Sequence, residues 1–301
     1  MQCLSPLRYP GGKAKLANFV QRLLETNQLC DAHYVEPYAG GASIALSLLV
    51  NEYVSHVHIN DLDRSIFAFW HSVLNDTDAL CDRVENATLS TASWTRQRAV
   101  QTRPNPTSLL QLGFSTLYLN RTNRSGIINS AGIIGGTAQK GKWKLDARFY
   151  RETLVHRIRT VASYRDRITL TNLDAATLLK RLVPQLSPKT LIYLDPPYYV
   201  KGKRRLYANH YEHADHAEIA ALMATCNHPW IVSYDDVEAI RKLYRGYRRM
   251  NYCLQYTAQE RYQGSEVMFV SKNLTLPSME GPRTPRSPTR RRDASLCRKS
   301  M

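Results

Sequence analysis

Short apolar runs alternate with amphipathic stretches along most of this 301-residue chain. The run at 190–194 lies between turn residues, a pattern typical of a buried strand in a parallel sheet. Comparable runs occur at 32–36, 57–60, 167–171 and 229–233, and two more near 247–256 and 266–272. Strands that alternate with helical patterns predict an α/β fold with a doubly wound, mostly parallel sheet.

Helical periodicity fills most of the intervals between these strands. The predicted helices cover 14–25, 43–50, 64–74, 78–87, 109–119, 149–161 and 237–243, and two more start at Asp174 and Asp215. Between residues 90 and 150 the alternation breaks, so we predict one domain formed by 1–75 and 150–276 and a smaller helical and loop insert at 76–149. The tail 277–301 is rich in Pro, Arg and Ser and holds almost nothing apolar, so it is expected to be disordered.

The strand at 190–194 ends abruptly in Asp195-Pro196-Pro197-Tyr198. Neither proline can donate to a sheet ladder, and each fixes its own φ angle. The motif therefore puts an acid, rigid carbonyls and an aromatic ring at the carboxyl edge of the sheet, where open α/β sheets bind ligands. A carboxylate and a carbonyl both accept hydrogen bonds, so together they suit the two N–H bonds of an exocyclic amine. The ring offers a face to a planar base, although a tight proline turn alone would use the same residues.

The N-terminal region contains a glycine-lysine stretch before a predicted helix. Gly11-Gly12-Lys13 resembles part of a phosphate loop, but Leu7 and Ala14 break the Walker pattern. What remains is a lysine with backbone N–H groups at a helix start, which suits a carboxylate or a phosphate. Tyr9 adds a ring that can stack on a flat group.

The strand at 32–36 continues into Glu36-Pro37-Tyr38-Ala39-Gly40-Gly41 and then into a helix. Strand, glycine turn and helix form the nucleotide-binding start of a doubly wound sheet. The third glycine of the dinucleotide pattern is missing. Asp61 follows the next strand, 20 residues after Gly41, where such folds place an acid that binds ribose hydroxyls.

The chain is strongly basic, with 41 Lys and Arg against 25 Asp and Glu and a formal charge of +16. The tail contributes +5, from seven basic and two acidic residues, which leaves +11 on residues 1–276. A body this basic favours a polyanionic partner, most simply nucleic acid. The six cysteines include no C-x-x-C pair, no apolar run reaches the roughly 20 residues of a membrane helix, and no secretion signal is evident. We therefore expect a cytoplasmic protein that does not bind membranes.

The predicted insert carries the candidate DNA contacts Arg121, Asn123, Arg124, Lys140 and Lys142. Arginine forks read guanine in the major groove, and asparagine can pair with adenine. A base-reading role predicts that replacing Arg121 or Arg124 with alanine broadens the set of recognised sites. Two other interpretations stay open, namely that these side chains only clamp phosphates and that the segment is a solvated loop.

No metal site is predicted. His210, His213 and His216 recur at intervals of three, which rotates them around a helix, and no cysteine lies near them. We interpret the polar residues here, Glu212 and Asp215 among them, as caps of a helix.

Four motifs in order along the chain resemble those of a known family. They are Arg8-Tyr9-Pro10-Gly11-Gly12-Lys13, Glu36-Pro37-Tyr38-Ala39-Gly40-Gly41, Asn60-Asp61-Leu62-Asp63 and Asp195-Pro196-Pro197-Tyr198. With an insert between the third and the fourth, residues 5–273 resemble the Dam-type N6-adenine DNA methyltransferases. One departure is Tyr38-Ala39-Gly40-Gly41, where relatives often have Phe-x-Gly-x-Gly, and it leaves the glycine contacts less defined than the fold.

This resemblance implies a seven-stranded methyltransferase sheet with a target-recognition insert, S-adenosylmethionine (SAM) as methyl donor, and no metal. It implies the catalytic residues Asp195, Pro196, Pro197 and Tyr198, and the cofactor contacts Tyr9, Lys13, Glu36, Gly40, Gly41, Asp61 and Asp195. The target adenine would be flipped out of double-stranded DNA, with N6 bound by Asp195 and the Pro196 carbonyl and the ring stacked on Tyr198. We expect a monomer or weak dimer, associated with the nucleoid through DNA, for which a partner restriction nuclease is possible.

Three other functions fit part of the sequence. Methylation of cytosine N4 uses the same chemistry on a similar amine, although the acid at the first position of the Asp195 motif favours adenine. A nicotinamide oxidoreductase would need the missing third glycine and an evident set of hydride-handling residues. A DNA-binding protein with an inactive enzyme fold is disfavoured by the intact Lys13, Asp61 and Asp195.

Overall fold

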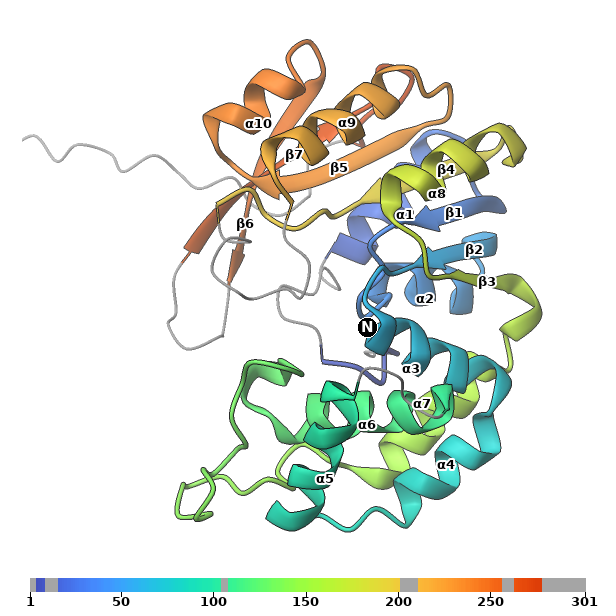
Figure 1. Cartoon of the computed structure of the whole chain (residues 1–301). Helices are drawn as coiled ribbons and strands as arrows, with labels where there is room; N and C mark the ends of the chain where they lie inside the picture. Colours follow the sequence, from blue (N-terminus) through green and yellow to red (C-terminus); the bar gives the residue numbers. More distant parts are fainter. Residues whose placement is uncertain (1–3, 9–15, 104–107, 201–210, 256–262, 278–301) are drawn as a thin grey trace, which may run out of the picture.

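The computed structural model describes residues 4–8, 16–103, 108–200, 211–255 and 263–277 (Figure 1). Within these residues one seven-stranded sheet has the strand order β3-β2-β1-β4-β5-β7-β6. The strands are β1 (Ala32–Glu36), β2 (Val54–Asn60), β3 (Ile168–Thr171), β4 (Thr190–Leu194), β5 (Trp230–Asp235), β6 (Arg248–Gln255) and β7 (Gln263–Val270). Neighbours among β1 to β5 pair in parallel, whereas β7 is antiparallel to both β5 and β6. The predicted mostly parallel α/β sheet is confirmed.

Helices cover both faces of this sheet. Successive strand residues point to opposite faces, and both faces carry apolar side chains that the helices bury. They are α1 (Ala17–Thr26), α2 (Ser43–Val50), α8 (Ala175–Leu182), α9 (His213–Ala224) and α10 (Glu238–Leu243). The apolar residues of α1 and α2 pack in one buried cluster with Tyr34 and Tyr193. Those of α8, α9 and α10 pack in another with Val35 and Ile192, the strand neighbours of those tyrosines. The sheet is therefore doubly wound.

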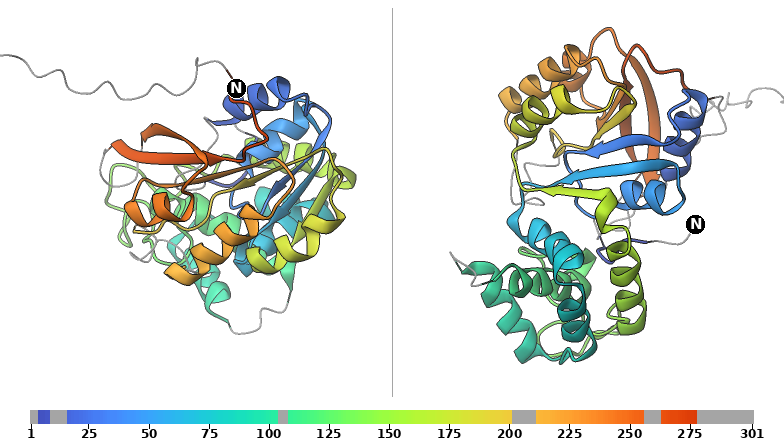
Figure 2. Two further views of the ribbon diagram at one scale, coloured as in Figure 1. Left: turned by 90° about the horizontal axis from the view of Figure 1, so that it is seen from above. Right: turned by 90° about the vertical axis from the view of Figure 1, so that its right-hand side faces the viewer.

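The other long helices form a second group, which we term the helical lobe. They are α3 (Arg64–Asn75), α4 (Thr77–Glu85), α5 (Thr91–Thr102), α6 (Leu109–Thr122) and α7 (Arg151–Ala162). The lobe lies below the sheet in Figure 1, and the right-hand view of Figure 2 shows the same two-part arrangement. In it α6 contacts α3 and α5, and α4 contacts α7.

The helical lobe extends beyond the predicted insert at both ends. α3 and α7 fall outside residues 76–149 yet pack with the helices of the insert. Arg159 on α7 forms an ion pair with Asp78 on α4, with 2.7 Å between nitrogen and oxygen. Arg151 donates to the backbone carbonyls of Glu85 and Ala87. The division of the chain into catalytic and recognition parts remains a prediction, and the packing favours wider limits for the second part.

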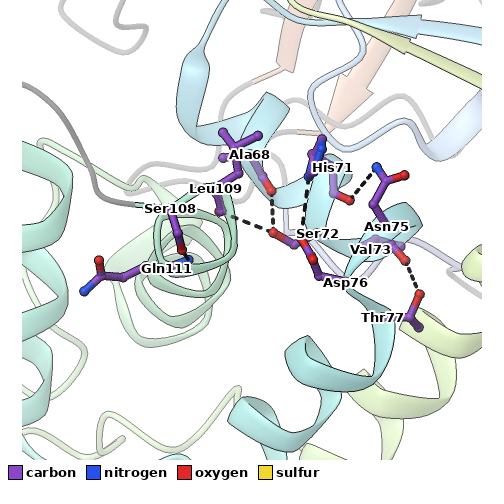
Figure 3. Close-up of polar contacts among 10 residues, drawn as sticks. All are labelled: Ala68, His71, Ser72, Val73, Asn75, Asp76, Thr77, Ser108, Leu109 and Gln111. Carbon is purple, nitrogen blue, oxygen red and sulfur yellow. Dashed lines mark hydrogen bonds and ion pairs between the residues drawn. The ribbon is translucent and has the colours of Figure 1, made fainter.

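α3 and α6 approach closely at Gly113 of α6. A Cβ atom there would lie 2.5 Å from the Ala68 carbonyl oxygen and 2.5 Å from the Ser72 hydroxyl oxygen. The Ser72 hydroxyl itself lies 2.7 Å from the Ala68 carbonyl oxygen and 3.3 Å from that of Leu109 (Figure 3). The side chain of Ser108 caps the first turn of α6 beside this crossing. Since α3 begins four residues after β2 ends, the crossing couples the lobe to the edge of the sheet.

α5 is the element that the sequence pattern did not predict. Its buried residues are only Ser93, Trp94 and Val100, so no apolar stripe of helical period marks it. Among the helices that the structure describes, none combines the length and the apolar character needed to span a bilayer.

Candidate active site

The carboxyl ends of β4, β1 and β2 lie side by side, because these strands are neighbours in the sheet and run in parallel. Asp195 directly follows β4, Glu36 ends β1 and Asp61 directly follows β2. Three acids therefore lie at the carboxyl ends of three neighbouring strands. In open α/β sheets this edge is the ligand-binding side.

An asparagine at the end of β2 holds these strand ends together. The Asn60 Nδ2 donates to the carbonyls of Pro37 and Leu173, each over 2.9 Å. Its Oδ1 accepts from the Thr171 hydroxyl at 2.8 Å and from the Leu173 N–H at 2.9 Å. The side chain is buried, so these bonds fix the loops after β1, β2 and β3 relative to one another. Asn60 is a motif residue for which the sequence suggested no role, and a polar residue ending an apolar strand was the available signal.

Asp61 supports the glycine turn that follows β1. Its Oδ2 accepts from the Gly40 N–H at 2.8 Å and its Oδ1 from the Asp63 N–H at 2.9 Å. Burial raises the pKa of the Asp61 carboxyl to about 7, although both backbone N–H groups oppose the rise. Gly40 has a φ of 47°, in the left-handed region that glycine enters without strain, and Gly41 is buried beside it. The side chain of Trp70 donates to the Gly40 carbonyl at 2.9 Å.

Glu36 turns into the protein and not toward the edge. Its Oε1 accepts from the Tyr34 hydroxyl at 3.0 Å and from the Ala45 N–H at 3.2 Å, which caps the first turn of α2. Burial raises the pKa of Glu36 to about 8, and the nearby Asp195 carboxylate adds to the rise against those two hydrogen bonds. Glu36 thus links the end of β1 to the first turn of α2. Its contact with a cofactor remains a prediction.

Asp195 is partly exposed at the end of β4, with Pro196 buried and Pro197 partly exposed after it. Its Oδ1 accepts a hydrogen bond from the Ser233 hydroxyl of β5 at 2.9 Å. The carboxylate is therefore both accessible and oriented by a neighbouring strand. A partly exposed acid held in one orientation is suited to bind an amine donor.

Tyr198 is only 7% exposed, and its hydroxyl donates to the Glu266 carboxylate of β7. The next two backbone N–H groups, of Tyr199 and Val200, donate to the Asp235 carboxylate at 2.9 and 3.0 Å. Little of the Tyr198 ring is open to a ligand in this arrangement. Stacking of a base on it remains a prediction that requires the ring to be uncovered.

Comparison with known families gives the class of enzyme to which this chain belongs. The family model of the D12 class N6 adenine-specific DNA methyltransferases matches residues 9–258. The chain belongs to this family. The match includes the motifs at Tyr9, Gly40, Asp61 and Asp195 and confirms the resemblance seen in the sequence.

Solved structures show a weaker likeness to this methyltransferase. The rRNA methyltransferase AviRa from Streptomyces viridochromogenes is 14% identical, with 88% of each chain covered and a TM-score of 0.39. A SAM-dependent methyltransferase from Agrobacterium tumefaciens is 7% identical, with 86% of this chain and 62% of that chain covered and a TM-score of 0.41. A search of curated proteins gave no match.

Two predicted DNA contacts of the methyltransferase, Arg121 and Asn123, are turned inward. Arg121 is 7% exposed, and its guanidinium donates through Nε, at 2.8 Å, and through Nη2 to the Pro6 carbonyl oxygen. Asn123 is fully buried; it accepts from the Trp94 indole N–H at 2.6 Å and donates to the carbonyls of Ile127 and Ile128. These bonds tie both side chains to the protein itself, and a role for either one in DNA binding remains a prediction.

The end of α6 also holds the N-terminal segment in place. Asn120 accepts from the Arg8 N–H and donates to the Arg8 carbonyl, each at 2.7 Å. Gly126 has a φ of 76°, and a Cβ there would lie 2.6 Å from that same carbonyl oxygen. Arg8 directly precedes the predicted cofactor contacts Tyr9 and Lys13, which lie outside the described residues.

The other predicted DNA contacts, Arg124, Lys140 and Lys142, are exposed. Trp143, which follows Lys142, is 65% exposed, with the Lys142 ammonium 5.9 Å from its ring centre. The segment that carries them is folded. Its Ile134 N–H donates to the Thr122 carbonyl at 2.9 Å, and the Gln139 side chain bonds the carbonyls of Ile134 and Gly136.

Among the described residues, no three His, Cys, Asp or Glu side chains are grouped so that they could hold a metal ion. His216 is buried, with its Nδ1 3.0 Å from the Tyr234 hydroxyl. Glu212 and Asp215 form a capping box at the start of α9, so the interpretation of these residues as helix caps is confirmed. His210 lies outside the described residues.

Sequence reasoning missed Ser233, Asp235 and Glu266, the residues that hold the Asp195 segment from behind. Each is a buried polar residue in a strand, next to at least one buried apolar or aromatic residue. Such residues need internal partners, which is the signal that could have singled them out.

Proposed function

We propose that this adenine-specific methyltransferase carries out methyl transfer at the carboxyl ends of β4, β1 and β2. Asp195 would bind the N6 amine, and the glycine turn with Asp61 would bind SAM. One observation carries the proposal. Asp195 lies on the same edge of the sheet as the glycine turn, whose Gly40 N–H is hydrogen-bonded to Asp61. Methyl donor and acceptor can meet there without either crossing the core.

The residues present fit SAM. Each Asp61 oxygen accepts one backbone N–H, whereas a carboxylate offers about four acceptor sites, so Asp61 retains capacity for two ribose hydroxyls. Gly40 and Gly41 carry no side chain that would keep a ligand from the backbone. From its place in the sequence, Lys13 is suited to the methionine carboxylate and Tyr9 to stacking on a flat group.

The chain would activate the amine by hydrogen bonding. The N6 lone pair of adenine is delocalised into the ring, so the free amine is a weak nucleophile. Hydrogen bonds from its two N–H groups to Asp195 and to the Pro196 carbonyl would favour a tetrahedral nitrogen whose lone pair faces the donor. SAM supplies an electrophilic methyl group on sulfur. The N–C bond forms as the S–C bond breaks, and one proton leaves the nitrogen for Asp195 or water.

The substrate would be double-stranded DNA, from which the target adenine is flipped at a cost of a few kcal/mol. Support comes from the charge of +11 on residues 1–276 and from the exposed residues Arg124, Lys140, Lys142 and Trp143. The three cations among them are the exposed members of the five predicted DNA contacts, whereas Arg121 and Asn123 are buried. We propose that residues 76–149 form the target-recognition region. Because every assigned residue comes from one chain, a monomer suffices, working in the cytoplasm where chromosomal DNA lies.

Product analysis with an active-site variant tests this proposal. Purified protein, labelled SAM and plasmid DNA from a methylation-free host should give N6-methyladenine after digestion to nucleosides. Asp195→Ala should lower the single-turnover rate by at least about 10²–10³-fold while DNA binding and the melting temperature stay near wild type. Label in N4-methylcytosine would contradict the base assignment. An Asp195→Ala variant with more than a few per cent of wild-type rate would contradict the site assignment.

A further inference from the structure

The segment from Asp195 to Val200 is hydrogen-bonded to side chains of β5 and β7. Ser233 and Asp235 lie two residues apart on β5, so their side chains leave the same face of the sheet. Glu266 on β7 is the registered partner of Asp235. These three buried side chains contact the segment at three successive points.

Ser233 acts on the reacting carboxylate itself. Its hydroxyl donates to Asp195 Oδ1 at 2.9 Å, whereas the other acceptor in reach, the Leu194 carbonyl oxygen, is 3.5 Å away. A hydroxyl has one proton to donate, so the Tyr193 hydroxyl, 2.9 Å from Ser233 Oγ, must donate to Ser233 in turn. Ser233 and Tyr193 are 0% and 3% exposed. Two buried hydroxyl groups thus form a chain of hydrogen bonds, from Tyr193 to Ser233 and from Ser233 to the Asp195 carboxylate.

Asp235 and Glu266 hold the rest of the segment. The two Asp235 oxygens accept the consecutive backbone N–H groups of Tyr199 and Val200. Glu266 accepts from the Tyr198 hydroxyl. Hydrogen bonds to buried charged acceptors are among the stronger ones in proteins, so the segment after β4 is fixed to two strands that do not themselves carry the motif.

We propose that Ser233 is a positioning residue for methyl transfer, which fixes the Asp195 carboxylate in the orientation that the N6 amine requires. The inference rests on the role proposed for Asp195. The Ser233 hydrogen bond restricts rotation of the carboxylate about its Cβ–Cγ bond and favours the ionised form, the form that accepts N–H bonds. Catalytic groups need placement within about 0.5 Å of the productive geometry, so the loss of one such bond is felt in the rate.

Three variants test this role. Ser233→Ala removes the donor to Asp195, and Tyr193→Phe removes only the hydroxyl that supports Ser233. Ser271→Ala is the matched control, because Ser271 is a buried serine whose hydroxyl bonds the Trp230 N–H and the Asn273 side chain, away from Asp195. The readouts are the single-turnover rate across pH, the KM values for SAM and DNA, and the melting temperature.

Ser233→Ala should lower the single-turnover rate about 10- to 100-fold, the loss expected for one hydrogen bond to a charged group, with both KM values near wild type. The acid limb of its pH–rate profile should move to higher pH, a change that a purely structural defect would not produce. Tyr193→Phe should shift both in the same direction, by about two- to tenfold in rate. Ser271→Ala should keep the wild-type rate and profile.

Wild-type rate and profile in a folded Ser233→Ala variant would overturn the inference. If Ser233→Ala does not fold, Tyr193→Phe decides in the same way. Asp195→Ala, measured alongside, separates the two levels of the argument. Loss of activity there with full activity in Ser233→Ala removes only the positioning role, whereas full activity in Asp195→Ala removes the proposed site.

Discussion

The carboxyl edge of the sheet and the end of α6 both carry polar residues that the sequence analysis singled out, yet these residues are placed in opposite ways. At the edge, Asp61 and Asp195 are partly exposed at the ends of buried strands. At the end of α6, Arg121 and Asn123 are buried and bonded to the protein itself. A parallel strand ends at an open edge, so a polar residue just after it is placed where a ligand can reach it. α6 is buried on all sides from Leu112 to Thr122, so polar residues there meet backbone.

The largest effect that would test this contrast is on stability at Arg121. Arg121→Ala should lower the free energy of unfolding by about 2–4 kcal/mol, because the Pro6 carbonyl loses a charged donor and a buried side chain is deleted. The exposed Arg124 is the control, and Arg124→Ala should change stability by less than about 0.5 kcal/mol. Denaturant unfolding measures both. Equal stabilities for the two variants would show that burial is not what separates these arginines.

At the catalytic edge the corresponding change should affect ligand binding instead. Asp61→Ala should weaken SAM binding by about ten- to a hundredfold, because each charge-assisted hydrogen bond is worth roughly 1.5–3 kcal/mol. DNA affinity should stay near wild type. Calorimetry with SAM and anisotropy with a DNA duplex provide the two measurements. Unchanged SAM affinity would move the ribose site away from Asp61.

The exposed part of the α6 region should behave like a binding surface. If Arg124 reads a base, Arg124→Ala should cost about 1–3 kcal/mol on the cognate site and relax selectivity at one position. If it clamps a phosphate, all sequences should weaken alike and the salt slope should fall by about one. Methylome sequencing and salt titration distinguish the two. Arg121→Ala, measured at a temperature where the variant is folded, should leave the recognised DNA sequence unchanged. A broader set of methylated sequences would show instead that Arg121 reads a base.

The smallest expected effect is a pH dependence that only the edge should show. The Asp61 carboxyl has a pKa raised to about 7, and ribose hydroxyls donate best to its ionised form. SAM affinity should therefore fall as pH drops below 7, by at most about tenfold per unit. Asp61→Asn cannot titrate and should lack this component, whereas Arg121→Ala should retain it. An identical pH profile in wild type and Asp61→Asn would assign the titration to another group.

Much of the architecture follows from patterns that the sequence displays directly. The strand 190–194 was predicted with its observed bounds, and Asp195 follows it as expected. The helices at 43–50 and 109–119 were also predicted, the second three residues short of its end at Thr122. In these stretches the apolar residues form the core and the period of the pattern is strong. The acid at Asp61 was placed by its spacing from the glycine turn, a consequence of the βαβ unit.

The direction of polar side chains could not be predicted in the same way. Arg121 and Arg124 look alike in sequence, yet one is buried and the other exposed. Which one turns inward depends on the Pro6 carbonyl, 115 residues away along the chain. Ser233 supports Asp195 across 38 residues and a strand pairing. Such partners follow from tertiary contacts and leave no periodicity in the sequence.

Asn60 has a consequence for how this edge can change over time. One side-chain amide joins the loops after β1, β2 and β3, with both its donors and its acceptor in use. The glycine turn, the Asp61 loop and the Leu173 loop therefore meet at one buried side chain, so a change in the path of one loop affects the hydrogen bonds of the others. Aspartate has nearly the same shape but no N–H donors. In an Asn60→Asp variant, the oxygen in place of Nδ2 would face the carbonyl oxygens of Pro37 and Leu173. The described residues around Arg124 and Lys142 make no hydrogen bond with Asn60, so their sequence can change more freely. We therefore expect differences in the recognised DNA sequence to arise there and not at the edge of the sheet.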